Sequence, residues 1–379
     1  MGQKDITAVI LAAGCSSRME HFKPLLKIGD QTIIEKSVSL FRDAGVNDIR
    51  VVVGHNRELI EPILEKAGIR SIINEKNSRE MFSSVLTALE SLEPEVQAII
   101  LLPNDIPLVR HWTVQYLLRQ HQTSSRSILI PCFQDKRGHP VVIPSKYFST
   151  IRQWNGKDGL RGAFRHLSDT IVQLPVADAN ILFDIDTIED YEEAKARWLK
   201  YTVPTRGECE SILRDMAFVD ESIYAHCCMV ADVAGMICDA LNRSGYRMDR
   251  ELITAAGLLH DMYKGETRHD RKAAKVLTEM GFPGVADIVA AHKDIECSSR
   301  TPVNGAEILY LADKLVKGNA IVSLTTRFQK ALKRYGYDPK IKGKIEKRLQ
   351  NAVIIKAKVE AVTGRTISLD VGPLLQEMQ

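Results

Sequence analysis

The sequence predicts an α/β domain followed by an all-α domain, mainly because its periodicity changes near residue 200. Up to about residue 198, short apolar runs alternate with segments in which apolar residues recur at helical spacing. This alternation is typical of a Rossmann-like, mostly parallel sheet covered by helices. From residue 208 onward the pattern is helical and shows no clear strand, which predicts a helical second domain.

The individual runs define the expected elements. The candidate strands are short and apolar, and they lie at residues 6–11, 49–53, 69–73, 98–102, 127–131 and 140–143. Segments with helical spacing include 33–44 and 57–67. The segment 201–207 contains a proline and a glycine, which favours a linker. We therefore place the two domains at residues 1–200 and 208–379.

The composition is that of an ordinary globular protein. The chain has 379 residues, enough for two or three domains, of which 45% are apolar and 26% charged. Its net charge of +3 is too small to argue for a nucleic-acid partner. Its seven cysteines form no Cys-x-x-Cys pair, which favours reduced thiols in a cytoplasm. We find no apolar run of about 20 residues and therefore expect no membrane-spanning segment.

The first candidate strand opens into a loop suited to binding phosphate. Gly14, Ser16 and Ser17 are small, and small residues let backbone N–H groups approach an anion closely. Arg18 and Lys23 bring two cations to the same place. The loop is not a Walker motif, because no Gly-Lys-Ser/Thr follows. We expect it to neutralise the charge of a nucleoside triphosphate, with an ordinary strand-to-helix turn as the alternative.

An aspartate follows another apolar run of the first domain. Asp105 comes just after the candidate strand at 98–102, and Pro107 stops that strand from continuing. Because ligands bind at the carboxyl ends of parallel strands, Asp105 would face the phosphate loop. A carboxylate at this position is well placed to hold Mg²⁺. The alternative is an aspartate that only caps a turn.

The phosphate loop resembles the signature of the nucleotidyltransferases of molybdenum-cofactor biosynthesis, the MobA/MocA-like family. That signature is Leu-x-x-Gly-x-x-x-Arg-Met followed by a lysine, and the resemblance covers about residues 5–198. It implies that the catalytic residues are Arg18, Lys23 and Asp105, with Asp105 also a ligand of Mg²⁺. It implies that the nucleotide phosphates lie against Leu11, Ala12, Ala13, Gly14, Arg18 and Lys23.

Two further motifs are similar to motifs of the same family. Ser83 and Ser84 lie in a stretch that looks like a helix start next to the nucleotide, although serines there also satisfy free helix amides. Gly138, His139 and Pro140 match a Gly-x-Pro motif of the cytidylyl branch, which lies beside the nucleotide and the cofactor. A lone histidine at such a position would more often be structural, but a strand follows directly.

A last motif closes the first domain and has two interpretations. Thr187, with Asp190 three residues later, is a plausible helix cap. Asp186, just before it, is a candidate second metal ligand.

The resemblance also implies a reaction. The cytidylyl branch transfers a cytidylyl group from CTP, or a related NTP, to a molybdopterin-type cofactor and releases pyrophosphate. A molybdoenzyme or its chaperone is then an expected partner. Related nucleotidyltransferases act on other acceptors, so a sugar or polyol phosphate remains an alternative.

The second domain places ionisable residues where helical periodicity asks for apolar ones. Single histidines on apolar faces are usually satisfied core residues, but here six ionisable residues lie on such stripes. They are His226, His260, Asp261, His269, His292 and Asp313. A buried ionised carboxylate costs several kcal/mol unless a cation or donor compensates it. Because one or two metal ions would compensate all six residues, we predict a metal site.

The pattern of these residues resembles the HD superfamily of metal-dependent phosphohydrolases over about residues 220–320. The adjacent pair His260 and Asp261 is the hallmark of that family, and Asp261 is the implied catalytic residue. The additional His269 and His292 match the branch that binds two metals, often Fe or Mn. Lys264 is a candidate for orienting phosphate, with a lysine at a solvated helix end as the alternative. The chain as a whole is then expected to be a bifunctional enzyme, with a non-catalytic nucleotide-sensing HD domain as the alternative.

The C-terminal segment 327–358 is rich in lysine and arginine. Such a stretch can bind nucleic acid, but few aromatic residues interleave with the charges, and Asp338 and Glu346 interrupt them. We therefore expect a solvated helical face.

Overall fold

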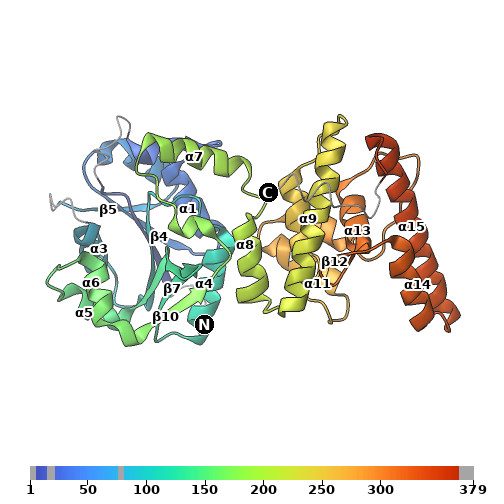
Figure 1. Ribbon diagram of the computed structural model, residues 1–379. Coiled ribbons are helices and arrows are strands. Elements are labelled where there is room, and N and C mark those ends of the chain that lie inside the picture. The colour runs from blue at the N-terminus through green and yellow to red at the C-terminus, as the bar shows by residue number, and fades with distance from the viewer. Residues whose placement is uncertain (1–5, 15–21, 76–80, 367–379) are drawn as a thin grey trace. The chain divides into compact units, whose positions relative to one another are not determined.

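The computed structural model of the chain describes residues 6–14, 22–75 and 81–366. It divides into two compact units, Met1–Tyr201 and Thr202–Gln379. The first unit contains a large sheet flanked by helices, and the second is built almost entirely from helices (Figure 1). This arrangement confirms the fold class that the sequence predicts.

A mixed, mostly parallel sheet forms the centre of the first unit. Its strands run in the order β10-β7-β9-β6-β1-β4-β5, with β8 paired to β7. β1 pairs in parallel with β4 and β6, whereas β9 runs antiparallel to β6 and β7. The strands are β1 (Ile6–Leu11), β4 (Asp48–Val53), β5 (Arg70–Ile73), β6 (Ala98–Pro103), β7 (Ile128–Phe133), β8 (Lys136–Arg137), β9 (Val141–Pro144) and β10 (Ile171–Pro175). A separate hairpin joins β2 (Lys27–Ile28) to β3 (Gln31–Thr32).

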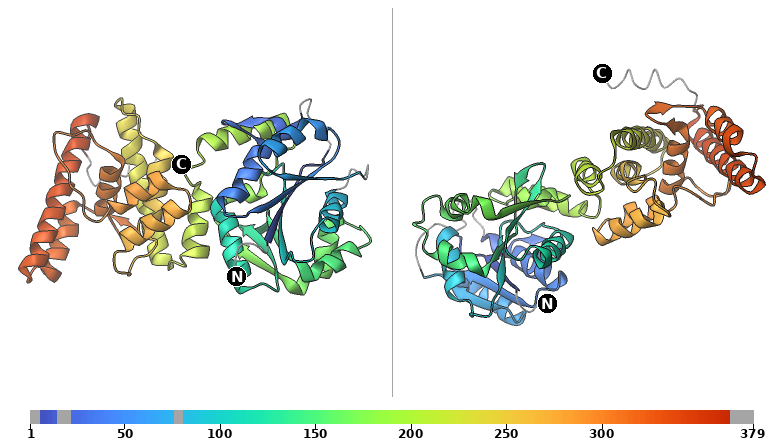
Figure 2. Two further views of the ribbon diagram at one scale, coloured as in Figure 1. Left: turned by 180° about the vertical axis from the view of Figure 1, so that it is seen from behind. Right: turned by 90° about the horizontal axis from the view of Figure 1, so that it is seen from below.

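Helices lie on both faces of this sheet (Figure 2). Side chains alternate along β1, so that Val9 and Leu11 share one face, where they join a core with Phe82 and Phe164. Helices α1 and α4 pack against each other outside that core. The helices of the unit are α1 (Ile33–Asp43), α2 (Glu61–Lys66), α3 (Met81–Glu90), α4 (His111–Thr123), α5 (Phe148–Arg152), α6 (Gly159–His166) and α7 (Ile188–Leu199).

The carboxyl ends of the central strands bring the predicted site segments to one edge of the sheet. Leu11, at the end of β1, lies in register with Val52 of β4 and with Pro103 of β6. The chain after β4 passes very close to the loop after β1, because a Cβ on Gly54 would lie 2.9 Å from the carbonyl oxygen of Ala13. The loops that follow β1, β4 and β6 therefore start side by side.

The second unit is a bundle of helices interrupted by one short hairpin. Helix α9 packs against α10, α13 and α15, and α11 packs against α12. The helices are α8 (Arg206–Ser211), α9 (Glu221–Arg243), α10 (Arg250–Leu259), α11 (His269–Glu279), α12 (Pro283–Ala290), α13 (Gly305–Leu315), α14 (Leu324–Tyr335) and α15 (Pro339–Thr363). The hairpin pairs β11 (Val316–Lys317) with β12 (Ala320–Ile321). These two-residue strands are too short to leave a period in the sequence.

The predicted linker is partly helical. Helix α8 already begins at Arg206, inside the segment 201–207, because Thr205 caps it. The Thr205 hydroxyl accepts a hydrogen bond from the backbone N–H of Glu208, and the Glu208 carboxylate accepts one from the backbone N–H of Thr205. This reciprocal cap was readable in the sequence as a threonine followed three residues later by a glutamate.

Helix α9 departs from one expectation. Among the described residues it is long and apolar enough to cross a membrane, by length and composition alone. This segment was not predicted from the sequence, because His226, Asp232 and Asp239 interrupt its apolar run. Half of its apolar window is buried inside the unit, and it packs on three neighbouring helices. Such burial is the behaviour of a core helix.

The contact between α9 and α10 leaves no room for a side chain at Gly257. A Cβ there would lie 2.7 Å from the Cα of Ala231. We predict that Gly257→Ala destabilises the protein by about 1–3 kcal/mol, because the two helices would have to separate. The matched control is Gly343→Ala in α15, where a Cβ meets nothing within 4 Å; it should stabilise by about 0.5–1 kcal/mol through helix propensity. Thermal unfolding of the full chain checks both, and equal effects would contradict the packing argument.

Candidate functional site

The first unit gathers carboxylates and a lysine at the carboxyl edge of its sheet. Asp105 follows β6, and Lys23 lies in the short turn after the phosphate loop. The Lys23 ammonium contacts an Asp186 carboxylate oxygen at 2.9 Å. Asp105 lies within electrostatic range of Lys23, Asp184 and Asp186. The structure thus brings three of the predicted site residues together and adds Asp184.

The electrostatics of this cluster suit a cation. The pKa of Asp105 is raised to about 6, mainly by burial; Lys23 lowers it, and Asp184 and Asp186 raise it. A carboxylate whose ionised form is destabilised by its surroundings is one that a divalent cation would stabilise. Asp186 is also part of the structure around the Thr187 cap, because its backbone N–H donates to Asp190.

Part of the predicted phosphate loop can be placed. Leu11 and Ala12 are buried, Ala13 is half-buried and Gly14 is exposed. A Cβ on Gly14 would meet no atom of the described residues within 4 Å. Arg18 lies outside the described residues.

The segment Gly138-His139-Pro140 reaches the same edge of the sheet. Val141 of β9 is in register with Leu101 of the antiparallel β6, so the residues before Val141 lie beside the end of β6. Gly138 is packed against Ile181, whose carbonyl oxygen would be 2.4 Å from a Cβ and accepts a hydrogen bond from the His139 backbone N–H. Burial lowers the pKa of the His139 imidazole to about 4, and its Nδ1 has no hydrogen-bond partner among the described residues.

Ser83 and Ser84 are held by the protein itself. Both hydroxyls accept hydrogen bonds of 3.0 Å from the side-chain amide of Asn74, which follows β5. Both residues are buried. Their position fixes the first turn of α3 against the sheet edge.

Two further residues of this edge, Asn104 and Asp184, were not predicted from the sequence. Asn104 is buried, its backbone N–H donates to the Leu11 carbonyl oxygen, and its side-chain oxygen has no partner among the described residues. Asp184 contributes charge beside Asp105. Asn104 directly precedes Asp105, and Asp184 lies two residues before Asp186. This closeness in sequence to predicted site residues is the signal that could have identified them.

The second unit brings all six predicted ionisable residues into one buried cluster. His226 lies in α9, His260 and Asp261 directly follow α10, His269 begins α11, and Asp313 lies in α13. His292 completes the cluster just after α12. Five of the six are at most 7% exposed, and His269 is half-buried.

Asp261 lies between two groups of histidines. Its Oδ2 is 3.7 Å from His226 Nε2 and 3.4 Å from His260 Nε2. Its Oδ1 is 3.4 Å from His269 Nε2 and 3.7 Å from His292 Nε2. In each group the candidate ligand atoms lie within 4.8 Å of one another. The two carboxylate oxygens therefore face two candidate metal positions.

Backbone hydrogen bonds orient three of these imidazoles. The Nδ1 atoms of His226, His260 and His292 lie 2.9, 2.8 and 2.7 Å from backbone carbonyl oxygens. A carbonyl oxygen only accepts, so each Nδ1 carries a proton, and Nε2 is the ring atom that faces the centre and is left for a metal. The Nε2 atoms of His226 and His260 are buried and have no hydrogen-bond partner among the described residues. Such orphaned acceptors fit a metal ion.

The charges around the cluster are compensated from outside. Burial raises the pKa of the Asp261 carboxyl, but His260 and Lys264 outweigh burial and hold that pKa well below its usual range. The Lys264 ammonium is 2.5 Å from Asp261 Oδ2. Burial and the neighbouring His260 lower the pKa of His292 to about 4. Burial lowers the pKa of His260, but the adjacent Asp261 outweighs burial and raises that pKa well above its usual value. A divalent ion would take the place of that proton, and imidazoles with ionised carboxylates are a donor set that transition metals accept.

Two family profiles match the chain, one in each unit. Residues 8–171 match the MobA-like NTP transferase domain, and residues 223–318 match the HD domain. The chain joins a MobA-like NTP transferase domain to an HD domain. This confirms both resemblances that the motifs indicated.

Known proteins similar to the chain include several nucleotidyltransferases. The molybdenum cofactor cytidylyltransferase of Escherichia coli is 25% identical over 193 residues, which are 51% of this chain and 97% of that protein. The bifunctional protein GlmU of Syntrophomonas wolfei is 28% identical over 157 residues, 40% of this chain. A solved structure of molybdopterin-guanine dinucleotide biosynthesis protein A from Archaeoglobus fulgidus superposes with a TM-score of 0.40 at 15% identity, covering 51% of this chain and 99% of that one.

The chain spans only part of some relatives. It covers 34% of the GlmU of Syntrophomonas wolfei and 48% of the GlmU of Carboxydothermus hydrogenoformans.

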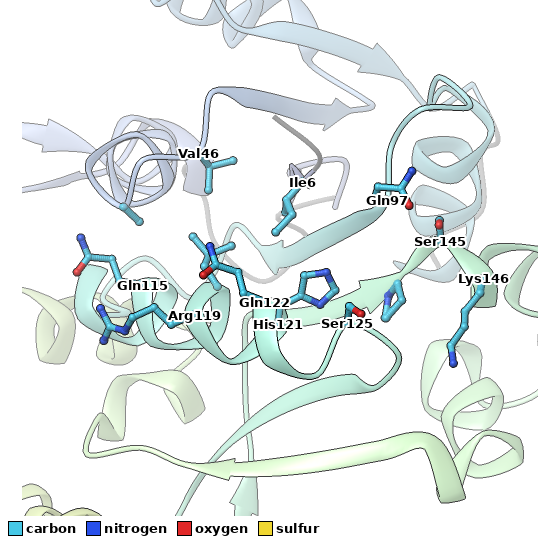
Figure 3. Close-up of a pocket in the computed structure, with 13 residues that line it drawn as sticks. Ile6, Val46, Gln97, Gln115, Arg119, His121, Gln122, Ser125, Ser145 and Lys146 are labelled. Carbon is cyan, nitrogen blue, oxygen red and sulfur yellow. The ribbon is translucent and has the colours of Figure 1, made fainter. Parts of the chain in front are cut away.

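A separate cavity of about 710 Å³ lies at the opposite edge of the transferase sheet (Figure 3). Ile6 begins β1 and Gln97 precedes β6, so the cavity borders the amino ends of the parallel strands. Helix α4 contributes Gln115, Arg119 and His121. Because nucleotide sites lie at the carboxyl edge, this cavity is not the transferase site.

We predict that Asp261→Asn weakens Mn²⁺ binding to the HD domain at least about tenfold, because it removes a carboxylate that faces both candidate metal positions. The matched control is Asp287→Asn, an exposed position on α12, which should bind Mn²⁺ like the unaltered chain. Calorimetric Mn²⁺ titration of the chelator-treated full chain measures both. Equal Mn²⁺ affinity in the two variants would contradict the assignment of Asp261 as a ligand.

Proposed function

We propose that the MobA-like domain transfers a cytidylyl group from CTP to a phosphorylated acceptor of the molybdopterin type, and that the HD domain hydrolyses a phosphate ester or anhydride. The observation that carries the first proposal is the match to the E. coli cytidylyltransferase over 97% of its length. A choline-phosphate cytidylyltransferase of Streptococcus pneumoniae, 32% identical over 74 residues, also supports a cytidylyl donor.

The transfer needs no protein nucleophile. An oxygen of the acceptor phosphate attacks the α-phosphorus of CTP in line, the bond from that phosphorus to the bridging oxygen breaks, and pyrophosphate leaves with the bond electrons. Catalysis then consists of positioning and of charge neutralisation. We assign Arg18 and Lys23 to the phosphate oxygens. Asp105, with Asp186, would hold Mg²⁺, which supplies charge stabilisation for the phosphates when bound.

The neighbouring groups fit this assignment. His139 is neutral at physiological pH, since its pKa is lowered to about 4, so it offers a hydrogen bond without adding charge. The buried side-chain oxygen of Asn104 offers an acceptor beside Asp105. We assign these two residues to the nucleotide or the acceptor. The backbone around Gly138 and Pro140 and the hydroxyls of Ser83 and Ser84 would complete the walls of the site.

For the HD domain we assign the six clustered residues to one or two divalent ions such as Fe or Mn. Such ions supply a water molecule whose pKa is lowered toward neutrality. The chain's own contribution is the orientation of the imidazoles by backbone carbonyls and the bridging position of Asp261.

Another acceptor and another role for the HD domain remain as second candidates. The match to a choline-phosphate cytidylyltransferase favours a small phosphorylated alcohol over a molybdopterin-type acceptor, and a sugar or polyol phosphate is the candidate of this kind. The HD domain would then be a non-catalytic module that senses a nucleotide. We place the protein in the cytoplasm, because the six described cysteines are free thiols. A molybdoenzyme or its chaperone is the proposed partner of the transferase.

A pyrophosphate-release assay separates the acceptors. With Mg²⁺ and molybdopterin, we predict that CTP supports release at least about tenfold faster than GTP or ATP, a difference of about 1.4 kcal/mol in transition-state binding. Omission of molybdopterin should abolish release. Release that depends on a sugar or polyol phosphate instead would favour the second candidate.

We predict that Asp105→Ala lowers the turnover of the transferase by roughly two to three orders of magnitude, because the carboxylate assigned to Mg²⁺ is lost. The unfolding temperature should not fall, since Asp105 is half-buried with a pKa that burial raises, and its removal relieves the cost of holding that charge there. Asp43→Ala, at the exposed end of α1, is the control and should turn over normally. Near-normal turnover of Asp105→Ala would contradict the proposed metal role.

A further inference from the structure

We propose that Arg327 binds the phosphate of the HD-domain substrate together with Lys264, and that this substrate is a phosphate monoester or terminal phosphate rather than a diester. The proposal rests on the hydrolase function proposed above. It goes beyond the matched HD segment, which ends at residue 318. Arg327 belongs to α14, which follows that segment.

The fold delivers Arg327 to the metal cluster from outside the HD segment. The hairpin β11–β12 turns the chain back after α13, and α14 then begins at Leu324. The Ser323 hydroxyl caps this helix by accepting a hydrogen bond from the backbone N–H of Thr326. Arg327 therefore lies in the first turn of a capped helix, where its backbone is fixed.

The guanidinium of Arg327 borders the cluster directly. One of its terminal nitrogens is 3.4 Å from Asp313 Oδ1, and the other donates to the backbone carbonyl oxygen of Val316. The same Asp313 oxygen is 3.4 Å from His226 Nε2, one of the orphaned ligand atoms. The side chain is 25% exposed, so it faces both the cluster and solvent.

Lys264 occupies the corresponding position beside the other carboxylate. Its ammonium is 2.5 Å from Asp261 Oδ2, and its side chain is 45% exposed. A third cation, Lys314, contacts Asp313 at 2.5 Å but is only 10% exposed. Lys314 thus compensates a buried charge, whereas Lys264 and Arg327 are accessible to a ligand that approaches the cluster.

The charges select the substrate class. Lys264, Lys314 and Arg327 outnumber the two carboxylates, Asp261 and Asp313, and every divalent ion at the cluster adds two further positive charges. A phosphate monoester brings up to two negative charges and three terminal oxygens, whereas a diester brings one charge and two such oxygens. A monoester offers a separate oxygen to the metal, the arginine and the lysine, whereas in a diester these three cations would share two oxygens, so the arrangement favours the monoester.

Arg327 also has a possible structural use, since it ties α14 to Val316. A purely structural Arg327 would act through the position of Asp313, and its removal would weaken metal binding. A phosphate-binding Arg327 would leave metal binding intact and weaken phosphate binding. The two roles therefore differ in a measurable way.

The experiment is a calorimetric titration of the full chain, first with Mn²⁺ and then, when Mn²⁺-loaded, with inorganic phosphate. The variants are Arg327→Met and Arg327→Lys, with Arg334→Met as the matched control, because Arg334 is an exposed arginine of the same helix. The heat of phosphate binding that is seen with the unaltered chain but not with Asp261→Asn is assigned to the HD site. This subtraction removes any phosphate bound by the transferase domain.

We expect Arg327→Met to keep its Mn²⁺ affinity within about twofold and to bind phosphate at least about tenfold more weakly, since a charge-assisted bidentate contact is lost. Arg327→Lys should fall between, and Arg334→Met should match the unaltered chain. Arg327→Met should also raise KM for p-nitrophenyl phosphate more than for bis(p-nitrophenyl) phosphate.

Unchanged phosphate binding in Mn²⁺-loaded Arg327→Met would overturn this inference alone, and so would a loss of Mn²⁺ affinity in that variant. An unaltered chain that binds no Mn²⁺ at the cluster would overturn the proposed hydrolase function itself, and this inference with it.

Discussion

A carboxylate buried among imidazoles is the constraint on which the helical unit depends. Asp261 is 6% exposed and lies within 3.7 Å of four histidine nitrogens. Taking an ionised carboxylate out of water costs several kcal/mol unless cations compensate it. The four histidines come from α9 and α11 and from the residues that follow α10 and α12, and the tight contact at Gly257 holds α9 against α10. The packing of the helices therefore determines the positions of the candidate metal ligands.

The transferase unit solves a similar problem at its surface. Parallel strands end at one edge, and the residues that follow them therefore share a small volume. Asp105, Asp184 and Asp186 would repel one another there, and Lys23 offsets only part of that repulsion. A cluster of this kind is poised for a divalent cation and for the phosphates that it accompanies. In both halves of the chain, a divalent cation would offset clustered carboxylates and so allow a phosphorylated ligand to bind beside them.

Much of the fold and of the HD cluster could be predicted from the sequence, because buried positions recur at the period of a helix or a strand. The apolar runs located six strands, and ionisable residues on apolar helical faces located the whole HD cluster. Exposed β10 was missed because an edge strand needs no apolar face. The antiparallel direction of β9 was not predicted, since direction is set by tertiary pairing. Arg327 was grouped with a basic tail because charge alone does not distinguish a solvated arginine from one that reaches a carboxylate.

The central claim is that the buried His/Asp cluster is a metal centre. Its most direct test is anomalous X-ray diffraction from crystals of the full chain grown with Mn²⁺ and recorded on both sides of the Mn absorption edge. The account predicts anomalous peaks at coordination distance, about 2.0–2.3 Å, from the Nε2 atoms of His226 and His260. A refined structure with no anomalous peak among these residues, and water or an empty space between the imidazoles, would contradict it.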